Sequence, residues 1–493
     1  METKAIDSYT ITSEKIPLQI HIYSQRGHPV PFYHLSLLNI TEETTRIIER
    51  IREDIITGLS FNLTNKKQGE KEIKAQFRTK LNEKIKSQFS DADDETIELI
   101  TNYIIITSLG LAELEFLLKD DDLEEVVVNG SKNHVWVYHK KYGWLKTNIK
   151  YDDENKIRHF ATQIGRNVDK GISLLQPLLD AHLESGDRVN ATLSPITSGG
   201  NTLTIRKFAK NPWSITTFLK NKTIDYSSAA FIWQAIQYEL SVLVVGGTGS
   251  GKTSFMNVIS NFFPPNQRLI SIEDTRELKL PKTLHWVPMQ SRLANPEGKG
   301  EITMLDCMIN TLRMRPDRII VGEVRKEKEL EVMFEAMHTG HSVYSTFHAS
   351  NVDEAIARIT NPPINLPPKL LSSLGLIVVQ HRNRRTGKRR TFQIAEIDEN
   401  GNPNLIMQHD HLTDKMNQVA QPNRTLKNLN LYTGMSSDQI YKEIQDKIMV
   451  LKWLVSKNIT DINIIGLILS DYYTEKNHLM NLVKSNKDYV SID

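Results

Sequence analysis

The sequence predicts an α/β protein in which a doubly wound domain follows a smaller α+β domain. Three patterns carry this prediction. The nearly continuous apolar run LSVLVVGG has the composition of a strand buried in a parallel sheet. Strand and helix patterns then alternate to about residue 396. Upstream, short alternating apolar runs are separated by turn residues, which is typical of hairpins.

Length and composition bound the organisation of the chain. It has 493 residues, enough for about three domains. The 61 Lys and Arg residues balance 59 Asp and Glu residues, so no overall field draws the chain to nucleic acid or to an anionic membrane. A single cysteine, Cys307, excludes an intramolecular disulfide framework and a four-cysteine zinc module. Since no run of 18 apolar residues occurs, we expect a water-soluble protein of a reducing cytoplasm.

We expect four regions along the chain. Apolar residues at helical spacing between about residues 39 and 118 predict an N-terminal helical region. After the two folded domains, the segments SDQIYKEIQDKIMVLKWLVSK and DINIIGLILSDYY predict a C-terminal helical region. The expected bounds are 1–110 for the N-terminal helices, 111–222 for the α+β domain, 223–400 for the doubly wound domain and 401–493 for the C-terminal helices.

The α+β domain is predicted from short elements in order. LEEVVVNG and HVWVYHKKYGWLKT are two β-rich runs separated by a turn at Asn129 and Gly130. A helix is expected over residues 153–165, and RVNATLSP with TLTIRKF predicts a further hairpin around a Ser-Gly-Gly-Asn turn.

A glycine-rich loop follows the apolar strand of the doubly wound domain. GGTGSGKT directly succeeds that strand and opens a helix, which is the context that a P-loop requires. Its glycines let backbone N–H groups turn inward around phosphates, and the helix start adds a positive dipole end. Lys252 would reach the β- and γ-phosphates and the Thr253 hydroxyl would ligate Mg²⁺. The predicted phosphate site comprises Gly246, Gly247, Thr248, Gly249, Ser250, Gly251, Lys252, Thr253 and Ser254.

Acidic residues end two further apolar runs. RIIVGEVR leads to Glu323, which would hold the hydration shell of Mg²⁺ or polarise an attacking water. Alone, such an acid is usually a solvated strand end, but a nearby P-loop reverses that preference. LISIEDTREL places Glu273, Asp274 and Glu277 at another strand end, as either a solvated turn or a site for Mg²⁺ and water. We favour the second interpretation.

Three histidines lie within the stretch EAMHTGHSVYSTFHAS. His338 and His341 have the spacing that a zinc site on one helix face could use, but Gly340 weakens a helix there. SVYSTFHA alternates in the manner of a strand and carries His348. From the spacing alone, a metal site and a sensor of charge both remain open.

Four motifs in this order resemble a known family: GGTGSGKT, SIEDTRE, RPDRIIVGEVR and TGHSVYSTFHA. They match the Walker A, Asp box, Walker B and His box of the secretion ATPase superfamily, which powers type II secretion and type IV pili. The segments GDRVNATLSP and TLTIRKF extend the resemblance upstream. The ending is similar to the archaeal branch, whose members drive the archaellum or archaeal adhesion pili, so the resemblance covers about residues 113–473.

The resemblance implies a homo-hexameric ring that binds and hydrolyses ATP with Mg²⁺. Each subunit would have a RecA-like P-loop domain, preceded by a PAS-like α+β domain and an N-terminal helical segment. His338 falls outside the His box, which makes the cluster a phosphate sensor rather than a metal site. Thr275 replaces a proline common in bacterial relatives and leaves open which Asp-box glutamate serves the water. The implied catalytic residues are Glu323, Glu277, Glu273, Arg188, Arg206, His341 and His348, with Thr253 and Glu323 on the metal.

The resemblance also implies partners and a location. An integral membrane platform protein of a pilus, archaellum or secretion machine would bind the motor, which would act in the cytoplasm at the inner face of the membrane. The basic hairpin VVQHRNRRTGKRRTFQIAEI, with its turn at Thr386 and Gly387, is either a solvated hairpin or a docking patch for the platform or acidic phospholipid. No nucleic acid is expected, because no aromatic residues interleave with these charges.

Three functions compete. The leading hypothesis is a motor that couples ATP hydrolysis to assembly or rotation of a filament or to pseudopilus secretion. The alternative is a RecA-like ring that translocates nucleic acid, since one fold supports several functions. A scaffold that binds ATP without turnover is a third, against which the full set of acidic residues argues.

Overall fold

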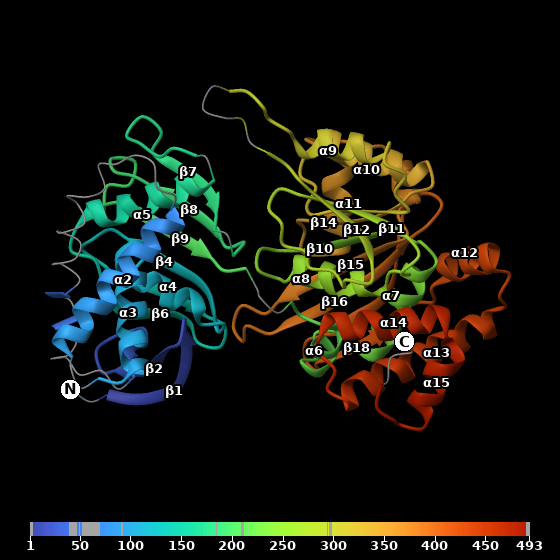
Figure 1. Cartoon of the computed structure of the whole chain (residues 1–493). Helices are drawn as coiled ribbons and strands as arrows, with labels where there is room; N and C mark the ends of the chain where they lie inside the picture. Colours follow the sequence, from blue (N-terminus) through green and yellow to red (C-terminus); the bar gives the residue numbers. More distant parts are fainter. Residues whose placement is uncertain are drawn as a thin grey trace. The chain divides into compact units, whose positions relative to one another are not determined.

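The computed structural model describes residues 3–38, 47–48, 50–51, 70–89, 92–168, 170–183, 185–208, 212–292, 294 and 298–489. These residues form a mixed α/β protein that divides into two compact units, Met1–Lys210 and Asn211–Asp493 (Figure 1). In the described part of each unit, the strands form one nine-stranded sheet.

The sheet of the first unit has the strand order β1-β2-β3-β6-β5-β4-β9-β8-β7. Neighbouring strands are antiparallel except β3 and β6, which pair in parallel. The strands are β1 (Thr3–Ser13), β2 (Ile16–Gln25), β3 (Phe32–Leu37), β4 (Leu123–Asn129), β5 (His134–His139), β6 (Gly143–Lys150), β7 (Leu178–His182), β8 (Arg188–Thr192) and β9 (Thr202–Arg206). The two predicted hairpins of the α+β region are thereby confirmed.

The prediction of a helical region over residues 1–110 is wrong for its first part, where β1, β2 and β3 lie. Alternate residues of β2 from Ile16 to Ile22 are buried, which is the period-two pattern of a strand with one face in the core. Because β3 pairs with β6, these strands extend the sheet of the α+β region. The expected boundary after residue 110 therefore does not separate two compact units.

Helices pack against this sheet. They are α2 (Glu70–Gln88), α3 (Asp94–Leu109), α4 (Glu113–Lys119) and α5 (Glu154–Asn167). The side chain of Asp153 accepts a hydrogen bond from the backbone of Asn155 and caps α5, which confirms the helix predicted from residue 153. Predicted helical residues 39–46 and 52–69 lie outside the described residues. No single described helix has the length and apolarity to cross a membrane, although α3 and α4, bent by 108° at their break, reach that composition together.

The sheet of the second unit has the order β12-β11-β13-β14-β10-β15-β16-β17-β18. From β12 to β15 the strands are parallel, and β16, β17 and β18 continue the sheet in antiparallel pairs. The strands are β10 (Val242–Gly246), β11 (Arg268–Glu273), β12 (His285–Gln290), β13 (Arg318–Val321), β14 (Ser342–Phe347), β15 (Leu376–Arg382), β16 (Arg389–Ile397), β17 (Pro403–Asp410) and β18 (Lys415–Gln418).

Both faces of the second sheet are buried. Val242 and Val244 of β10 join one apolar cluster, and Leu243 and Val245 join another on the opposite face. Since neither face meets water, the strand is apolar at every position, as the run LSVLVVGG predicted. The helices are α6 (Ile215–Lys220), α7 (Tyr226–Gln237), α8 (Lys252–Ile259), α9 (Met304–Thr311), α10 (Glu327–His338), α11 (Val352–Thr360), α12 (Asn423–Thr433), α13 (Ser437–Ser456), α14 (Ile462–Thr474) and α15 (Lys476–Lys484), with 3₁₀ turns η1 (Ser260–Phe262) and η2 (Pro368–Ser373).

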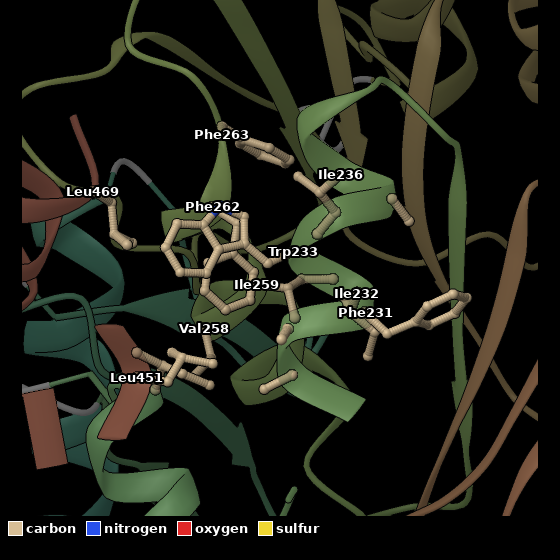
Figure 2. Packing of buried hydrophobic residues seen from close by; sticks show 14 of the residues in the cluster. Phe231, Ile232, Trp233, Ile236, Val258, Ile259, Phe262, Phe263, Leu451 and Leu469 are labelled. Atoms are coloured by element: carbon tan, nitrogen blue, oxygen red, sulfur yellow. The ribbon is translucent and has the colours of Figure 1, made fainter. Parts of the chain in front are cut away.

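The C-terminal helices belong to the core of the second unit. Trp233 of α7 stacks on Phe262 with ring centroids 5.2 Å apart, and Leu451 of α13 and Leu469 of α14 join the same cluster (Figure 2). Both predicted C-terminal helices are confirmed. The expected boundaries after residues 222 and 400 differ from the structure, because α6 already belongs to this unit and β17 and β18 extend its sheet.

Candidate functional site

The carboxyl ends of β10, β13 and β14 meet at one edge of the parallel sheet. Val245 pairs with Phe347, and Val321 pairs with Ser345, so the segments that leave these strands start side by side. Parallel strands of a doubly wound sheet place ligand sites at this edge. The predicted phosphate loop begins at this edge. Glu323 and His348 lie at the same edge, in the segments that follow β13 and β14.

The phosphate loop joins β10 to α8, as predicted, and glycine is required at several of its positions. Gly249 and Gly251 have φ angles of +71° and +92°, which favour glycine. A Cβ on Gly246 would lie 2.4 Å from the Ser250 hydroxyl and 2.5 Å from the Gln380 carbonyl oxygen. The loop thus adopts a compact turn ahead of the helix start.

Lys252, the first residue of α8, is 9% exposed and bonds back to its own loop. Its ammonium group donates hydrogen bonds to the carbonyl oxygens of Gly246, at 2.9 Å, and Gly247, at 3.3 Å. Burial lowers its pKa, and the carboxylates of Glu323 and Glu277 oppose that fall. The lysine therefore stands beside two acids, in a place where a phosphate would compensate its charge.

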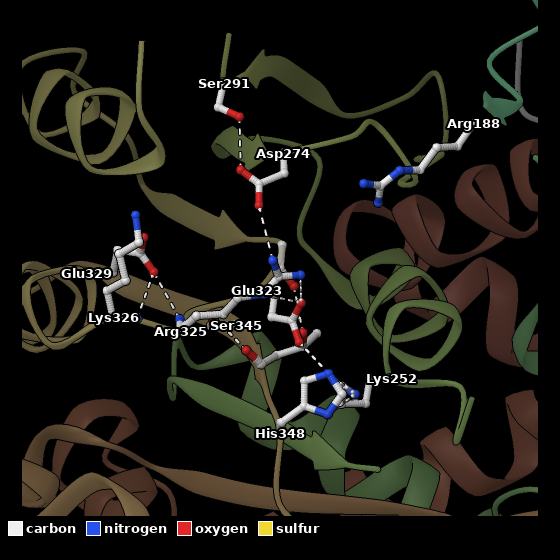
Figure 3. A network of polar contacts seen from close by, with 12 residues as sticks. Arg188, Lys252, Asp274, Ser291, Glu323, Arg325, Lys326, Glu329, Ser345 and His348 are labelled. Carbon is white, nitrogen blue, oxygen red and sulfur yellow. Dashed lines mark hydrogen bonds and ion pairs between the residues drawn. The ribbon is translucent and has the colours of Figure 1, made fainter. Parts of the chain in front are cut away.

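The side chain of Glu323, which follows β13, contacts the ring of His348, which follows the neighbouring strand β14 (Figure 3). Its Oε1 lies 2.8 Å from Nε2 of His348, and Nε of Arg325 donates a 2.9 Å hydrogen bond to its Oε2. Both ring nitrogens of His348 lie 3.5 Å from the Lys252 ammonium. Burial and the charge of Lys252 lower the pKa of His348, which favours the uncharged ring at neutral pH, while Oε1 of Glu323 is buried without a hydrogen-bond partner among the described residues.

Arg325 is a site residue that the sequence reasoning missed. Besides bonding Glu323, its guanidinium group lies 3.9 Å from Asp274, which accepts a 2.9 Å hydrogen bond from the Ser291 hydroxyl. The carboxylates raise the pKa of Arg325, the bond to Glu323 contributing most. The alternation in GEVR, with an acid and a base two residues apart after a strand, was the available signal.

The two candidate glutamates of the Asp box have different environments. Glu273 is 2% exposed, and its Oε1 accepts hydrogen bonds from the backbone N–H groups of Glu277, at 2.8 Å, and Leu278, at 3.0 Å. Burial raises its pKa to about 7. Glu277 is half-buried, and its carboxylate favours the charged form of Lys252. Glu273 thus closes its own loop, while the Glu277 carboxylate acts toward the phosphate lysine.

His341 and His348 lie at opposite ends of β14. His341 precedes the strand and its Nδ1 is 3.2 Å from the carbonyl oxygen of Ala336, roughly 20 Å along the chain from the phosphate edge. Helix α10 ends at His338, and Gly340 has a φ angle of +95°, so no continuous helix carries both His338 and His341. Among the described residues, no group of three His, Cys, Asp or Glu residues is arranged to hold a metal.

Arg188 and Arg206 lie in the first unit, opposite each other on β8 and β9, and both are exposed. The guanidinium group of Arg188 donates hydrogen bonds of 3.3 and 3.0 Å to Asp180. The adjacent Asp187 accepts a hydrogen bond from the backbone N–H of Phe208. The structure thus holds the two arginines together on one hairpin.

The residues at the sheet edge fit Mg²⁺ carried with phosphates. Thr253 in the first turn of α8 and Glu323 supply the oxygen donors that Mg²⁺ prefers. Within the described part of the chain, the buried Oγ of Ser250 and Oε2 of Glu273 have no hydrogen-bond partner. Buried polar atoms without partners are rare, so this edge retains acceptor and donor capacity for a ligand.

The chain is similar to several known proteins. The family model described as type II/IV secretion system protein matches residues 110–449. An uncharacterized protein of Methanocaldococcus jannaschii is 43% identical over 286 residues, which cover 52% of this chain and 39% of that protein, so the chain spans less than half of that relative. The type IV secretion system protein PtlH of Bordetella pertussis is 30% identical over 55% of this chain and 89% of its own length. The solved ATPase DotB of Legionella pneumophila is 19% identical with a TM-score of 0.44, over 72% of this chain and 94% of its own.

Proposed function

We propose that this chain, which belongs to the type II/IV secretion system protein family, is an ATP hydrolase that acts as the motor of a secretion or pilus machine. The observation that carries the proposal is the meeting of Lys252, Glu323 and His348 at the carboxyl edge of the parallel sheet, beside a glycine loop. A cationic clamp that stabilises charge on the phosphates and a carboxylate that can accept a proton from water are groups that assist hydrolysis of a phosphoanhydride.

Each residue has a distinct role in the proposed reaction. The loop N–H groups and Lys252 bind the β- and γ-phosphates and stabilise the charge that develops on the leaving oxygen. Glu323 orients the attacking water and accepts its proton as the new bond to phosphorus forms. Mg²⁺ held by Thr253 and Glu323 would supply further positive charge at the phosphates. His348, whose Nε2 lies 2.8 Å from Glu323, changes partners when the γ-phosphate leaves and transmits the nucleotide state to β14.

The proposal also specifies the domain types, the assembly and the partner of this chain, in addition to its family. We infer a RecA-like second unit, a PAS-like first unit and a homo-hexameric ring, which the motif order GGTGSGKT, SIEDTRE, GEVR and TGHSVYSTFHA supports. The partner would be an integral membrane platform protein of an archaellum, type IV pilus or pseudopilus system. The motor would then act at the cytoplasmic face of the membrane.

Phosphate release from ATP by the purified full-length chain tests the proposal. Lys252→Ala removes the clamp and should abolish nucleotide binding, whereas Glu323→Gln keeps the shape, binds ATP and loses on the order of 10²-fold or more in kcat. Glu331→Gln, an exposed glutamate on α10, is the matched control and should hydrolyse ATP at the normal rate. Normal turnover by Glu323→Gln would remove Glu323 from the reaction.

The same assay separates a membrane motor from a nucleic-acid translocase. Vesicles that contain acidic phospholipid should stimulate hydrolysis by the motor, because its platform lies in a membrane. Stimulation by single-stranded DNA and not by vesicles would support the alternative ring that moves nucleic acid.

A further inference from the structure

Two arginines of the basic hairpin contact the phosphate loop. Nε of Arg389, at the start of β16, donates a 3.1 Å hydrogen bond to the carbonyl oxygen of Gly249. A Cβ added to Gly251 would meet Cδ of Arg389 at 3.4 Å, so the alkyl part of this side chain lies on the loop. Nη1 of Arg382, at the end of β15, lies 3.2 Å from the position of a Cβ on Gly249.

The strand register explains why both arginines reach the loop. Gly246 pairs with Gln380 of β15, so this strand leaves the sheet beside the P-loop and carries Arg382 over it. Arg382 and Arg389 are direct partners in the antiparallel β15–β16 pair and project from the same face of the hairpin. The hairpin therefore presents two guanidinium groups to one loop.

This arrangement places like charges opposite each other, and an anion bound between them would stabilise both. The neighbouring Arg390 projects from the other face, where it forms a bidentate pair with Asp414 at 2.7 and 2.9 Å. Arg389 instead donates its hydrogen bond to a carbonyl oxygen. Because that oxygen carries no formal charge, this contact does not neutralise the positive charge of Arg389. Both Arg382 and Arg389 are half-buried, in contrast to the exposed residues at the hairpin tip.

We infer that Arg382 and Arg389 complete the nucleotide site from the β15–β16 hairpin, where they bind the phosphate chain together with the P-loop. Arg389 is also a positioning residue, because its hydrogen bond to the Gly249 carbonyl holds the backbone of the phosphate loop. This inference rests on the proposed function. A guanidinium fork suits phosphate oxygens, and Lys252 adds a point charge.

The test measures the dissociation constants of ATP and ADP, with Mg²⁺, for the full chain and its variants. Arg389→Ala and Arg382→Ala should each weaken both nucleotides about 10-fold or more, the loss expected for a charge-assisted hydrogen bond. Arg389→Lys keeps the charge but not the Nε donor, so it should recover only part of the affinity and KM should rise more than kcat falls.

The matched control is Arg384→Ala, which removes one positive charge from the exposed tip of the same hairpin. Its dissociation constants should equal those of the unaltered chain, which separates direct contact from the general field of the hairpin. Equal weakening in Arg384→Ala and Arg389→Ala overturns the inference. So do nucleotide constants within twofold of normal in Arg389→Ala and Arg389→Lys variants that melt at the normal temperature.

A second arm asks whether the two arginines serve lipid phosphate instead. Flotation with phosphatidylglycerol vesicles should be unchanged in Arg389→Ala, and its loss with normal nucleotide binding would assign these residues to lipid. If the unaltered chain binds neither ATP nor ADP, the proposed function fails. If the unaltered chain binds both nucleotides and the arginine variants bind them equally tightly, the proposed function stands and this inference fails.

Discussion

Nε2 of His348 lies 2.8 Å from Oε1 of Glu323, and this contact joins the carboxyl end of β14 to that of β13. The same imidazole lies 3.5 Å from the ammonium group of Lys252, so one ring touches both the phosphate lysine and the acid. Any change in the charge between these two groups will act on His348. The proposed sensor role follows from this position rather than from the number of histidines in the motif.

His348→Ala should lower kcat by about 10-fold or more, because Glu323 loses the imidazole that lies 2.8 Å from its carboxylate. ATP affinity should change less. His338→Ala, at the end of α10, is the control and should be silent. In the unaltered chain, the lowered pKa of His348 keeps the ring neutral at pH 7, so activity should fall once the pH drops below that lowered pKa and protonation places a cation beside Lys252. Equal activity of both histidine variants would contradict the sensor role.

Glu273→Gln should make the chain more stable at pH 8. Burial raises the pKa of Glu273 to about 7, so between pH 4.5 and 7 the folded chain keeps a proton that the unfolded chain releases. The free energy of unfolding therefore falls as pH rises through this window, by about 3 kcal/mol. Glutamine keeps the Oε1 acceptor and cannot ionise. Between pH 5 and pH 8, the melting temperature should fall less for the variant than for the unaltered chain. An equal fall for both chains would contradict the raised pKa of Glu273.

Lys447 on α13 is fully buried against α7, and burial lowers its pKa to about 7. Its ammonium group lies 3.5 Å from Glu443, which also accepts hydrogen bonds from Gln234 at 2.8 Å and Tyr238 at 3.0 Å. Lys447→Met should destabilise the chain by about 3 kcal/mol, because it leaves a buried carboxylate without its cation. The double variant Glu443→Gln with Lys447→Met should regain much of this loss in urea unfolding. A single variant as stable as the unaltered chain would count against the buried pair.

Arg188→Ala and Arg206→Ala should depress kcat much more than ATP affinity. We propose, from the resemblance of their motifs alone, that these arginines meet the nucleotide phosphates, since an arginine that meets the transferring phosphoryl group supplies about 10³-fold or more in rate. Asp180→Asn is the matched control, because it breaks the 3.0 Å ion pair of Arg188 and keeps the guanidinium. Mixtures of unaltered and Arg188→Ala subunits would reveal action across a subunit boundary. Unchanged kcat in both arginine variants would return the hairpin to a structural role.

Local patterns predicted much of the second unit and of its site. The run LSVLVVGG is a strand buried on both faces, and GGTGSGKT begins a helix at Lys252, because the chemistry of a P-loop is contained in consecutive residues. The basic hairpin turns near Thr386 and Gly387, as its turn residues predicted. Helix α5 (Glu154–Asn167) begins after the capping side chain of Asp153 for the same local reason.

The sequence by itself therefore determined the type of most elements and the phosphate loop, since hydrophobic period, caps and turns act over a few residues. Only the tertiary structure decided that β3 joins β6, that one strand length separates His341 from His348, and that Arg325 and Arg389 contact the site. These relationships depend on strand order and register between segments far apart in the chain. Burial of Lys447 has the same origin, because a lysine on an amphipathic helix is usually solvated and only the packing of α13 on α7 removes it from water.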